Sequence, residues 1–340
     1  EVENPVYDMT FEDKHTDVVA AQQAADTILE ALEQAKRPVI MLGHGVDSSF
    51  SQQKLIRFAQ KRQIPIITSV LAKSVLGYDH PLNFGCIGGA YGHRYANMIA
   101  NAKSDLLLCF GISLCTRQIG TKVHEFARGA KIIRIDIDPY NLQRDIHENG
   151  ENEVKLQAET GAVIDCLAKV DDPDIEGVSD WLNVCTEIKE NLQAVDDATP
   201  ERYPNRMIAD LSDMLEDTSA IAVDVGQHMV WSYQSFKNHE GQKLLFSGGH
   251  GAMGYGLPAA IGAYYATGKP TACICGDGAL QMNIQELEWV KRENLPVKIM
   301  VMNNEALGMI RHLQRDYFDC LFAGTTDGCG FASCNFAEVA

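Results

Sequence analysis

The residues of this chain best suited to chemistry are a carboxylate and a carboxamide, each of which directly follows an apolar run. Gly276-Asp277-Gly278 follows the run Thr271–Cys275, and 24 residues later Asn303-Asn304 follows the run Pro296–Met302. The intervening segment Met282–Glu293 has helical periodicity, so the whole stretch predicts a βαβ unit. Both polar loops then leave the carboxyl ends of neighbouring parallel strands, where open parallel sheets bind ligands.

This pair of side chains suits a hard divalent cation that also carries a diphosphate. Mg²⁺ accepts one or two protein oxygens at close to octahedral angles and completes its shell with phosphate oxygens and water. We therefore predict that Asp277 and Asn304 bind such a cation. The alternative for Asp277 is a helix N-cap. The backbone amides of Gly278 and Ala279 open the following helix and can donate to a phosphate, while glycine at 276 and 278 permits close approach.

Four ordered blocks of sequence resemble thiamine diphosphate (ThDP) enzymes of the acetolactate synthase branch. The resemblance covers nearly the whole chain and is strongest from Ala220 to Gln314. The alternative is a generic Rossmann-type turn with a chance Gly-Asp-Gly. Besides the Gly276–Asn304 pattern, the blocks are Asp224–His228, Gly248–Pro258, Gln281–Leu287 and Asn303–Met309.

The resemblance implies a role for each of a set of residues in the second half of the chain. Asp277, Asn304 and the backbone carbonyl of Ala306 would hold Mg²⁺. Gln227 and His228 would bind the diphosphate, although His228 could instead be a loop histidine exposed to solvent. The remaining cofactor-binding residues would be Gly251, Met253, Gly276, Gly278, Ala279 and Met309.

The loop that contains Gly251 and Met253 would hold the aminopyrimidine ring of the cofactor. In this interpretation the Gly251 carbonyl and the Met253 amide hydrogen-bond the ring, and the Met253 side chain bends the cofactor. The bend would bring the 4′-imino nitrogen next to the acidic thiazolium carbon, where it would act as a proximity base. The alternative for Met253 is ordinary gap-filling in a core.

The activity that the resemblance implies is decarboxylation of a 2-keto acid, followed by ligation of the enamine to a second 2-keto acid. The chain departs from the biosynthetic acetolactate synthases at Leu313, where they commonly carry Trp, which leaves the second substrate open. Another ThDP-dependent decarboxylase or acyltransferase, or a non-catalytic protein of this fold, are the alternatives. No Gly-x-Gly-x-x-Gly follows a strand, which argues against a NAD-type dehydrogenase.

FAD is a second candidate cofactor, because the matching domain of acetolactate synthases binds it. Gly43 and Gly45 follow one strand, Arg117 follows another, and Asp136 ends a third. The Asp pair that usually precedes the matching arginine is replaced here by Cys115-Thr116. The alternative is a structural domain whose glycines simply make turns, since Gly-x-Gly alone is a weak signal.

Composition narrows the class of protein. The chain has 340 residues, of which 46% are hydrophobic, and a net charge of −17. This charge argues against nucleic-acid binding, which requires clustered Lys and Arg, and no apolar run reaches membrane-spanning length. The ten cysteines match no zinc pattern. We expect reduced cysteines in a cytoplasmic homodimer or homotetramer, whose cofactor is shared between subunits.

Strands that alternate with helices predict an α/β fold with two doubly wound parallel (Rossmann-like) sheets. We expect a linker at 1–16, a central domain at 17–170, an interdomain connection at 171–204 and the diphosphate-binding domain at 205–340. Thr16 is the expected N-cap of a helix from Asp17 to about Lys36. The other expected elements are strands Pro38–Leu42, Ile64–Thr68, Leu106–Phe110, Lys131–Asp136 and Ala220–Val225, and helices Ser51–Arg62, Ala90–Ala102, Trp181–Leu192 and Gly256–Thr267.

The resemblance also implies that part of the machinery lies outside this sequence. Related enzymes carry an N-terminal pyrimidine-binding domain whose Glu activates the cofactor, and we expect this domain to be missing here. The chain also stops inside the expected helix Phe336–Ala340. No residue of this chain is assigned a catalytic role, because Glu286 and Glu288 are interpreted as structural, and the fragment alone is expected to be inactive.

Overall fold

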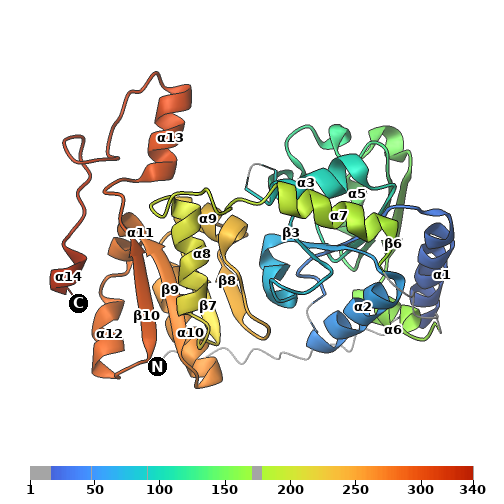
Figure 1. Cartoon of the computed structure of the whole chain (residues 1–340), viewed down its shortest axis with the longest axis horizontal. Coiled ribbons are helices and arrows are strands. Elements are labelled where there is room, and N and C mark those ends of the chain that lie inside the picture. Colours follow the sequence, from blue (N-terminus) through green and yellow to red (C-terminus); the bar gives the residue numbers. More distant parts are fainter. Residues whose placement is uncertain (1–16, 47, 90, 171–177, 340) are drawn as a thin grey trace, which may run out of the picture.

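The computed structural model describes residues 17–46, 48–89, 91–170 and 178–339. It contains two parallel β-sheets with helices packed around each, one sheet for each half of the chain (Figure 1). The α/β class with two doubly wound domains is therefore confirmed. None of the described helices has the length and apolar content needed to cross a bilayer.

The first sheet has six parallel strands in the order β3-β2-β1-β4-β5-β6. Its neighbouring strands are hydrogen-bonded in parallel throughout, and its central strands are apolar because helices cover both faces. The strands are β1 (Pro38–Leu42), β2 (Ile66–Thr68), β3 (Asn83–Cys86), β4 (Leu106–Phe110), β5 (Lys131–Asp136) and β6 (Glu153–Gln157).

The second sheet has four parallel strands in the order β10-β9-β7-β8. Alternate residues of these strands serve two separate cores, because successive side chains in a strand point to opposite faces. Ala272 and Ile274 belong to one core, and Cys273 and Cys275 to the other. The strands are β7 (Ala220–Val223), β8 (Lys243–Phe246), β9 (Thr271–Gly276) and β10 (Val297–Met302).

The helices connect these strands and cover their faces (Figure 1). In the first half they are α1 (Val18–Gln34), α2 (Ser49–Arg62), α3 (Arg94–Met98), α4 (Thr116–Ile119), α5 (Pro139–Gln143), α6 (Thr160–Leu167) and α7 (Asp180–Asn191), with short turns η1 (Val70–Val75), η2 (Ile99–Lys103), η3 (Val123–Glu125) and η4 (Glu148–Gly150). In the second half they are α8 (Pro204–Met214), α9 (Gln227–Ser235), α10 (Gly256–Thr267), α11 (Asp277–Met282), α12 (Glu286–Arg292), α13 (Gly308–Tyr317) and α14 (Phe336–Val339).

Several element boundaries differ from the sequence-based expectation. The N-cap of α1 is Asp17, whose Oδ1 accepts hydrogen bonds from the amides of Val19 and Ala20; Thr16 lies outside the described residues. The helix expected at 90–102 begins only at Arg94 and continues as the π-helical turn η2, and Ala90 itself lies outside the described residues.

The single helix expected at Met282–Glu293 is in fact two helices. The first, α11, already begins at Asp277, and Asn283 breaks it with a φ of −134°. The Asn283 side chain donates to the carbonyl of Gly254 at 2.6 Å. That hydrogen bond links the break to the loop 248–258, called the glycine-rich loop below. Helical periodicity alone missed the break because it depends on this contact with a distant segment.

The segment expected to connect the two domains contains α7, which packs on the first sheet. Trp181, Leu182 and Cys185 are buried in the core of the first half, and the Trp181 indole donates to the carbonyl of Pro38 at 2.9 Å. From the end of α7 the chain crosses to α8 beside the second sheet (Figure 1).

Gly43 and Gly45, which follow β1, lie against the backbone of the turn that follows β4. The Gly43 amide donates to Phe110 and the Gly45 amide to Gly111, at 2.8 and 3.0 Å. A Cβ at Gly43 would lie 1.9 Å from the Gly111 carbonyl oxygen. Close packing of two strand ends therefore accounts for these glycines without a ligand.

We predict that Gly43→Ala destabilises the protein by about 1–3 kcal/mol, because the added methyl overpacks a backbone contact. Gly129→Ala is the matched control, since a Cβ at Gly129 meets nothing within 4 Å. The measurement is the free energy of unfolding in urea for both variants. Equal stabilities of the two variants would contradict this account of Gly43.

Candidate functional site

A cavity of about 210 Å³ lies where the strands of the second sheet end. The residues predicted from the sequence to bind ThDP and the metal all line it, although they come from separate loops. The cavity therefore brings together what the sequence spread over more than 80 positions, from 227 to 309. The predicted residues in its wall are Gln227, His228, Gly251, Met253, Gly276, Asp277, Gly278, Ala279, Asn304, Ala306 and Met309.

Asp277 is the carboxylate of this cavity, and it is only 2% exposed. Its Oδ2 is buried without any hydrogen-bond partner. Burial raises the pKa of its carboxyl group, although the nearby backbone amides of Gly278, Ala306 and Asn304 oppose the rise. A buried carboxylate oxygen with no partner is energetically unfavourable, so this atom is suited to a cation.

Asn304 belongs to the loop that follows β10 and is linked to two neighbours. Its Nδ2 donates to Gln227 Oε1 at 3.3 Å, and its Oδ1 accepts from the Ala306 amide at 3.2 Å. Among the described residues, no group of three or more His, Cys, Asp or Glu could hold a metal. A cation here would depend on Asp277 together with neutral oxygens, which is the donor set that Mg²⁺ and Ca²⁺ accept.

Glycines allow this crowded arrangement. A Cβ at Gly308 would lie 2.1 Å from Gln227 Oε1 and 2.9 Å from Asn304 Nδ2. A Cβ at Gly276 would come within 3.2 Å of the His228 ring. The polar side chains can therefore meet only because these backbone positions carry no side chain.

His228 is buried rather than exposed to solvent, so the alternative of a surface loop histidine is wrong. It is 4% exposed, and its Nε2 has no hydrogen-bond partner. Burial lowers the pKa of His228 to about 4, partly opposed by a hydrogen bond with the backbone of Asp224. The ring is therefore neutral at pH 7, and it carries an unpaired buried nitrogen in a residue that lines the cavity.

The glycine-rich loop is held at its carboxyl end by Asp224, a residue to which the sequence analysis gave no role. Asp224 Oδ1 accepts from the amide of Gly254 at 3.0 Å, and Oδ2 accepts from that of Gly256 at 2.6 Å. Burial raises the pKa of Asp224, and these amides oppose the rise. The sequence feature that could have indicated this role is the position of Asp224 at the end of β7, directly before Val225-Gly226.

The face of α13 is only partly directed at the cavity. Met309 lines the cavity, whereas Leu313, one turn further along, is 53% exposed and lies outside its wall. The loop before α13 is braced by a short antiparallel bridge between Ala306 and Thr326. The Leu307 amide also donates to the Thr325 carbonyl at 2.9 Å. This bracing by residues 325–326 was not foreseen from the sequence.

The remaining residues expected to hold FAD also make contacts within the protein. Asp136 Oδ1 accepts from the Asp138 amide at 2.9 Å, and Oδ2 accepts from Asn141 Nδ2 at 3.2 Å. Arg117 donates to carbonyl groups of the glycine-rich loop in the other half of the chain. Gly43 and Gly45 pack on backbone, as described above.

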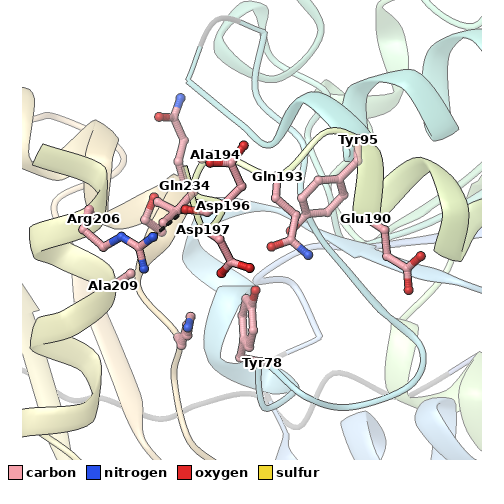
Figure 2. Close-up of a pocket in the computed structure, with 13 residues that line it drawn as sticks. Tyr78, Tyr95, Glu190, Gln193, Ala194, Asp196, Asp197, Arg206, Ala209 and Gln234 are labelled. Atoms are coloured by element: carbon pink, nitrogen blue, oxygen red, sulfur yellow. Dashed lines mark hydrogen bonds between the residues drawn. The ribbon is translucent and has the colours of Figure 1, made fainter. Parts of the chain in front are cut away.

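A second cavity, of about 330 Å³, lies where the two halves of the chain meet (Figure 2). Tyr78 and Tyr95 enter it from the first half, and Arg206 and Gln234 from the second. Asp196 and Asp197 of the crossing segment also line it, and Arg206 donates to the Asp196 carbonyl. It contains none of the sequence-predicted site residues, and acidic and basic groups are mixed in its wall.

Comparison with protein families matches both halves of the chain to domains of thiamine pyrophosphate enzymes. Residues 25–167 match the family described as "Thiamine pyrophosphate enzyme, central domain". Residues 224–340 match "Thiamine pyrophosphate enzyme, C-terminal TPP binding domain". All the residues predicted to bind ThDP and metal fall inside the second match.

Similar curated proteins are acetolactate synthases. The chain is 33% identical to the acetolactate synthase isozyme 1 large subunit of Escherichia coli (strain K12), over 90% of this chain and 52% of that protein. It is 32% identical to the isozyme 2 large subunit of the same organism, over 96% and 55%. It is 35% identical to acetolactate synthase 1, chloroplastic, of Nicotiana tabacum, over 84% and 42%. The chain thus spans about half the length of the curated relatives that it matches.

We predict that His228 titrates with a pKa of about 4, as followed by the NMR signals of its ring. An unfolded histidine titrates near 6.5, so the unfolded state binds the proton more tightly. Stability that depends on this ring is present above pH about 6.5 and is lost as the pH falls toward 4. His228→Gln should remove this part of the pH dependence. A titration midpoint near 6.5 in the folded protein would contradict the prediction.

Proposed function

This chain belongs to the thiamine pyrophosphate enzyme family, and from that premise we propose that its second domain binds ThDP together with Mg²⁺. The observation that carries the proposal is the buried Asp277 Oδ2, which has no partner and shares one cavity with Asn304 and Ala306. The enzymes of this family include the acetolactate synthases that the chain resembles. The proposed reaction type is therefore 2-keto acid decarboxylation followed by carbon–carbon ligation.

The residues present fit the proposed cofactor and cation. Asp277 would supply the anionic ligand, and Asn304 and Ala306 would supply neutral oxygens. The unpaired His228 Nε2 and the Gln227 amide would face the diphosphate. Gly251 and Met253 would hold the aminopyrimidine, and both line the same cavity. Gly278 and Ala279 add backbone amides at the start of α11.

The bound cofactor supplies the carbanion chemistry, and the protein supplies binding, orientation and electrostatics. In this chain Asp277 would offset the charge of the cation, and Asn304 is hydrogen-bonded to Gln227. Met253 adds an apolar surface to the wall, and Met302 and Leu307 extend it. These apolar side chains would keep water away from the reacting groups.

The cavity contains one carboxyl group, that of Asp277, among the described residues that line it. The proposed metal ligand cannot also serve as the acid that activates the pyrimidine ring. We therefore propose that this acid comes from a part of the enzyme other than these cavity walls, which is consistent with a cofactor shared within a homodimer or homotetramer. The proposal includes no flavin, since Gly43, Gly45, Arg117 and Asp136 all make contacts within the protein.

We predict that Asp277→Asn abolishes Mg²⁺-dependent ThDP binding and stabilises the protein in the absence of ligand. Removal of a buried unpaired charge should raise the melting temperature by about 1–2 °C, the shift expected for roughly 1 kcal/mol in a chain of 340 residues. Calorimetric titration and thermal unfolding are the two measurements. Asp136→Asn is the matched control, because that carboxylate lies outside the cavity.

Retention of Mg²⁺-dependent ThDP binding by Asp277→Asn would contradict the proposed metal site. The same conclusion would follow if the control variant lost binding to the same extent.

We also predict that the 340-residue chain alone does not consume pyruvate in the presence of ThDP and Mg²⁺. The reason is that the described cavity wall offers no second carboxyl group as activating acid. The measurement is a steady-state assay of pyruvate consumption, with a full-length acetolactate synthase as positive control. Steady turnover by the chain alone would contradict this part of the proposal.

A further inference from the structure

Arg117, which lies in the first half of the chain, hydrogen-bonds the glycine-rich loop of the second half. Its Nη1 donates to the carbonyl oxygens of Gly248 at 3.1 Å and Gly249 at 3.3 Å. An arginine is charged at every pH at which the protein is folded, and hydrogen bonds from a charged donor are stronger than those between neutral groups. Arg117 is thus an electrostatic link between the two domains.

The position of Arg117 is set by its own domain. It lies on α4, whose first turn is closed by a hydrogen bond from the Cys115 amide to Gln118 Oε1 at 3.0 Å. The carbonyl of Gln118 in turn accepts from the Gly89 amide at 3.1 Å. The helix that carries the guanidinium group is therefore anchored to the turn after β3.

Other hydrogen bonds also join the two domains. The Tyr78 amide donates to the Asn238 carbonyl at 2.8 Å, and Asn238 Nδ2 donates to the Leu76 carbonyl at 2.9 Å. Leu71 lies so close to Gly248 that a Cβ there would be 2.8 Å from its Cδ2. The first domain therefore offers a fixed support to the start of the loop.

The middle of the loop has fewer polar contacts with the rest of the protein, although Met253 packs against one core of the second sheet. A Cβ at Gly249 or at Gly251 would meet nothing within 4 Å, and Gly251 has a φ of +76°. The Ala252 amide donates to Ser247 Oγ at 3.2 Å, a hydrogen bond between neighbouring residues of the chain. Asp224, which holds the amides of Gly254 and Gly256, is the next polar anchor from a distant segment. The segment 250–253 therefore lies between two side-chain anchors from distant segments, Arg117 before it and Asp224 after it.

We propose that Arg117 is a positioning residue for the cofactor-binding loop. By holding the carbonyls of Gly248 and Gly249, it keeps Gly251 and Met253 in the wall of the cavity, although Arg117 itself does not line that cavity. The central domain thereby contributes to the ThDP site through the loop rather than by contact with the ligand. The expected effect on ThDP binding rests on the proposed function. The restraint of the loop by Arg117 rests on geometry alone.

The test compares Arg117→Ala, Arg117→Lys and the control Arg128→Ala in the full 340-residue chain. Arg128 is an exposed arginine of the same domain. Hydrogen exchange of the backbone amides at 247–255, measured by mass spectrometry without ligand, reports the restraint. Calorimetric titration with ThDP and Mg²⁺ measures the effect of the restraint on ThDP affinity. Thermal unfolding shows whether a substitution changes the stability of the whole protein.

For Arg117→Ala we expect about tenfold faster exchange at 247–255 and about tenfold weaker ThDP binding, as a lost charged hydrogen bond implies. Arg117→Lys should show smaller changes in both amide exchange and ThDP affinity, because lysine keeps a charged donor. Arg128→Ala should match the parent protein, and the melting temperature should be nearly unchanged in all three variants.

Exchange at 247–255 that is the same in Arg117→Ala as in Arg128→Ala would overturn the proposal. Faster exchange with parental ThDP affinity would also overturn it, because the restraint would then not serve the site. If the parent protein bound no ThDP, the proposed function would fail, and the exchange measurement would still decide whether Arg117 restrains the loop.

Discussion

The candidate site depends on the parallel register between β9 and β10. Cys275 lies opposite Val301 and Gly276 opposite Met302, so both strands end at the same level. Asp277 begins α11 directly after one strand, and Asn304 lies in the loop directly after the other. Each face of this sheet packs against a different core. If one strand moved by one residue along its neighbour, every side chain of that strand would point to the opposite face. The burial of β9 on both faces therefore also fixes where the proposed metal ligands meet.

This arrangement places unfavourable groups in the interior. Asp277 Oδ2 and His228 Nε2 are both buried without partners. Burial raises the pKa of Asp277 and lowers that of His228, so in both side chains it favours the neutral form. Such groups are retained where a ligand compensates for them, and sites of this kind are commonly less stable than the rest of a protein. The two residues that carry these unpaired atoms line one cavity together with Asn304. A cation and a diphosphate are complementary to that combination.

Much of the fold could be predicted from the sequence where hydrophobic runs were long. Strands β1, β4 and β5 have the predicted bounds, because each is a continuous buried apolar segment between turns. The short β3 with its central glycine and the polar edge strand β6 were not predicted, since neither carries a strong apolar signal. The site residues were assembled from resemblance and spacing, and the structure brings them into one cavity. The role of Asp224 and the link from Arg117 to the loop depend on contacts between distant segments, which no local pattern encodes.

The account makes one central claim, that Asp277 and Asn304 hold a diphosphate through a shared cation. The most direct measurement is a crystal structure of the protein with ThDP and Mn²⁺, in which anomalous scattering locates the metal. The account predicts a single Mn²⁺ peak in this cavity, within about 2.6 Å of oxygens from Asp277, Asn304 and Ala306. A bound ThDP whose metal lies elsewhere, or an Asp277 side chain turned away from the ion, would contradict it.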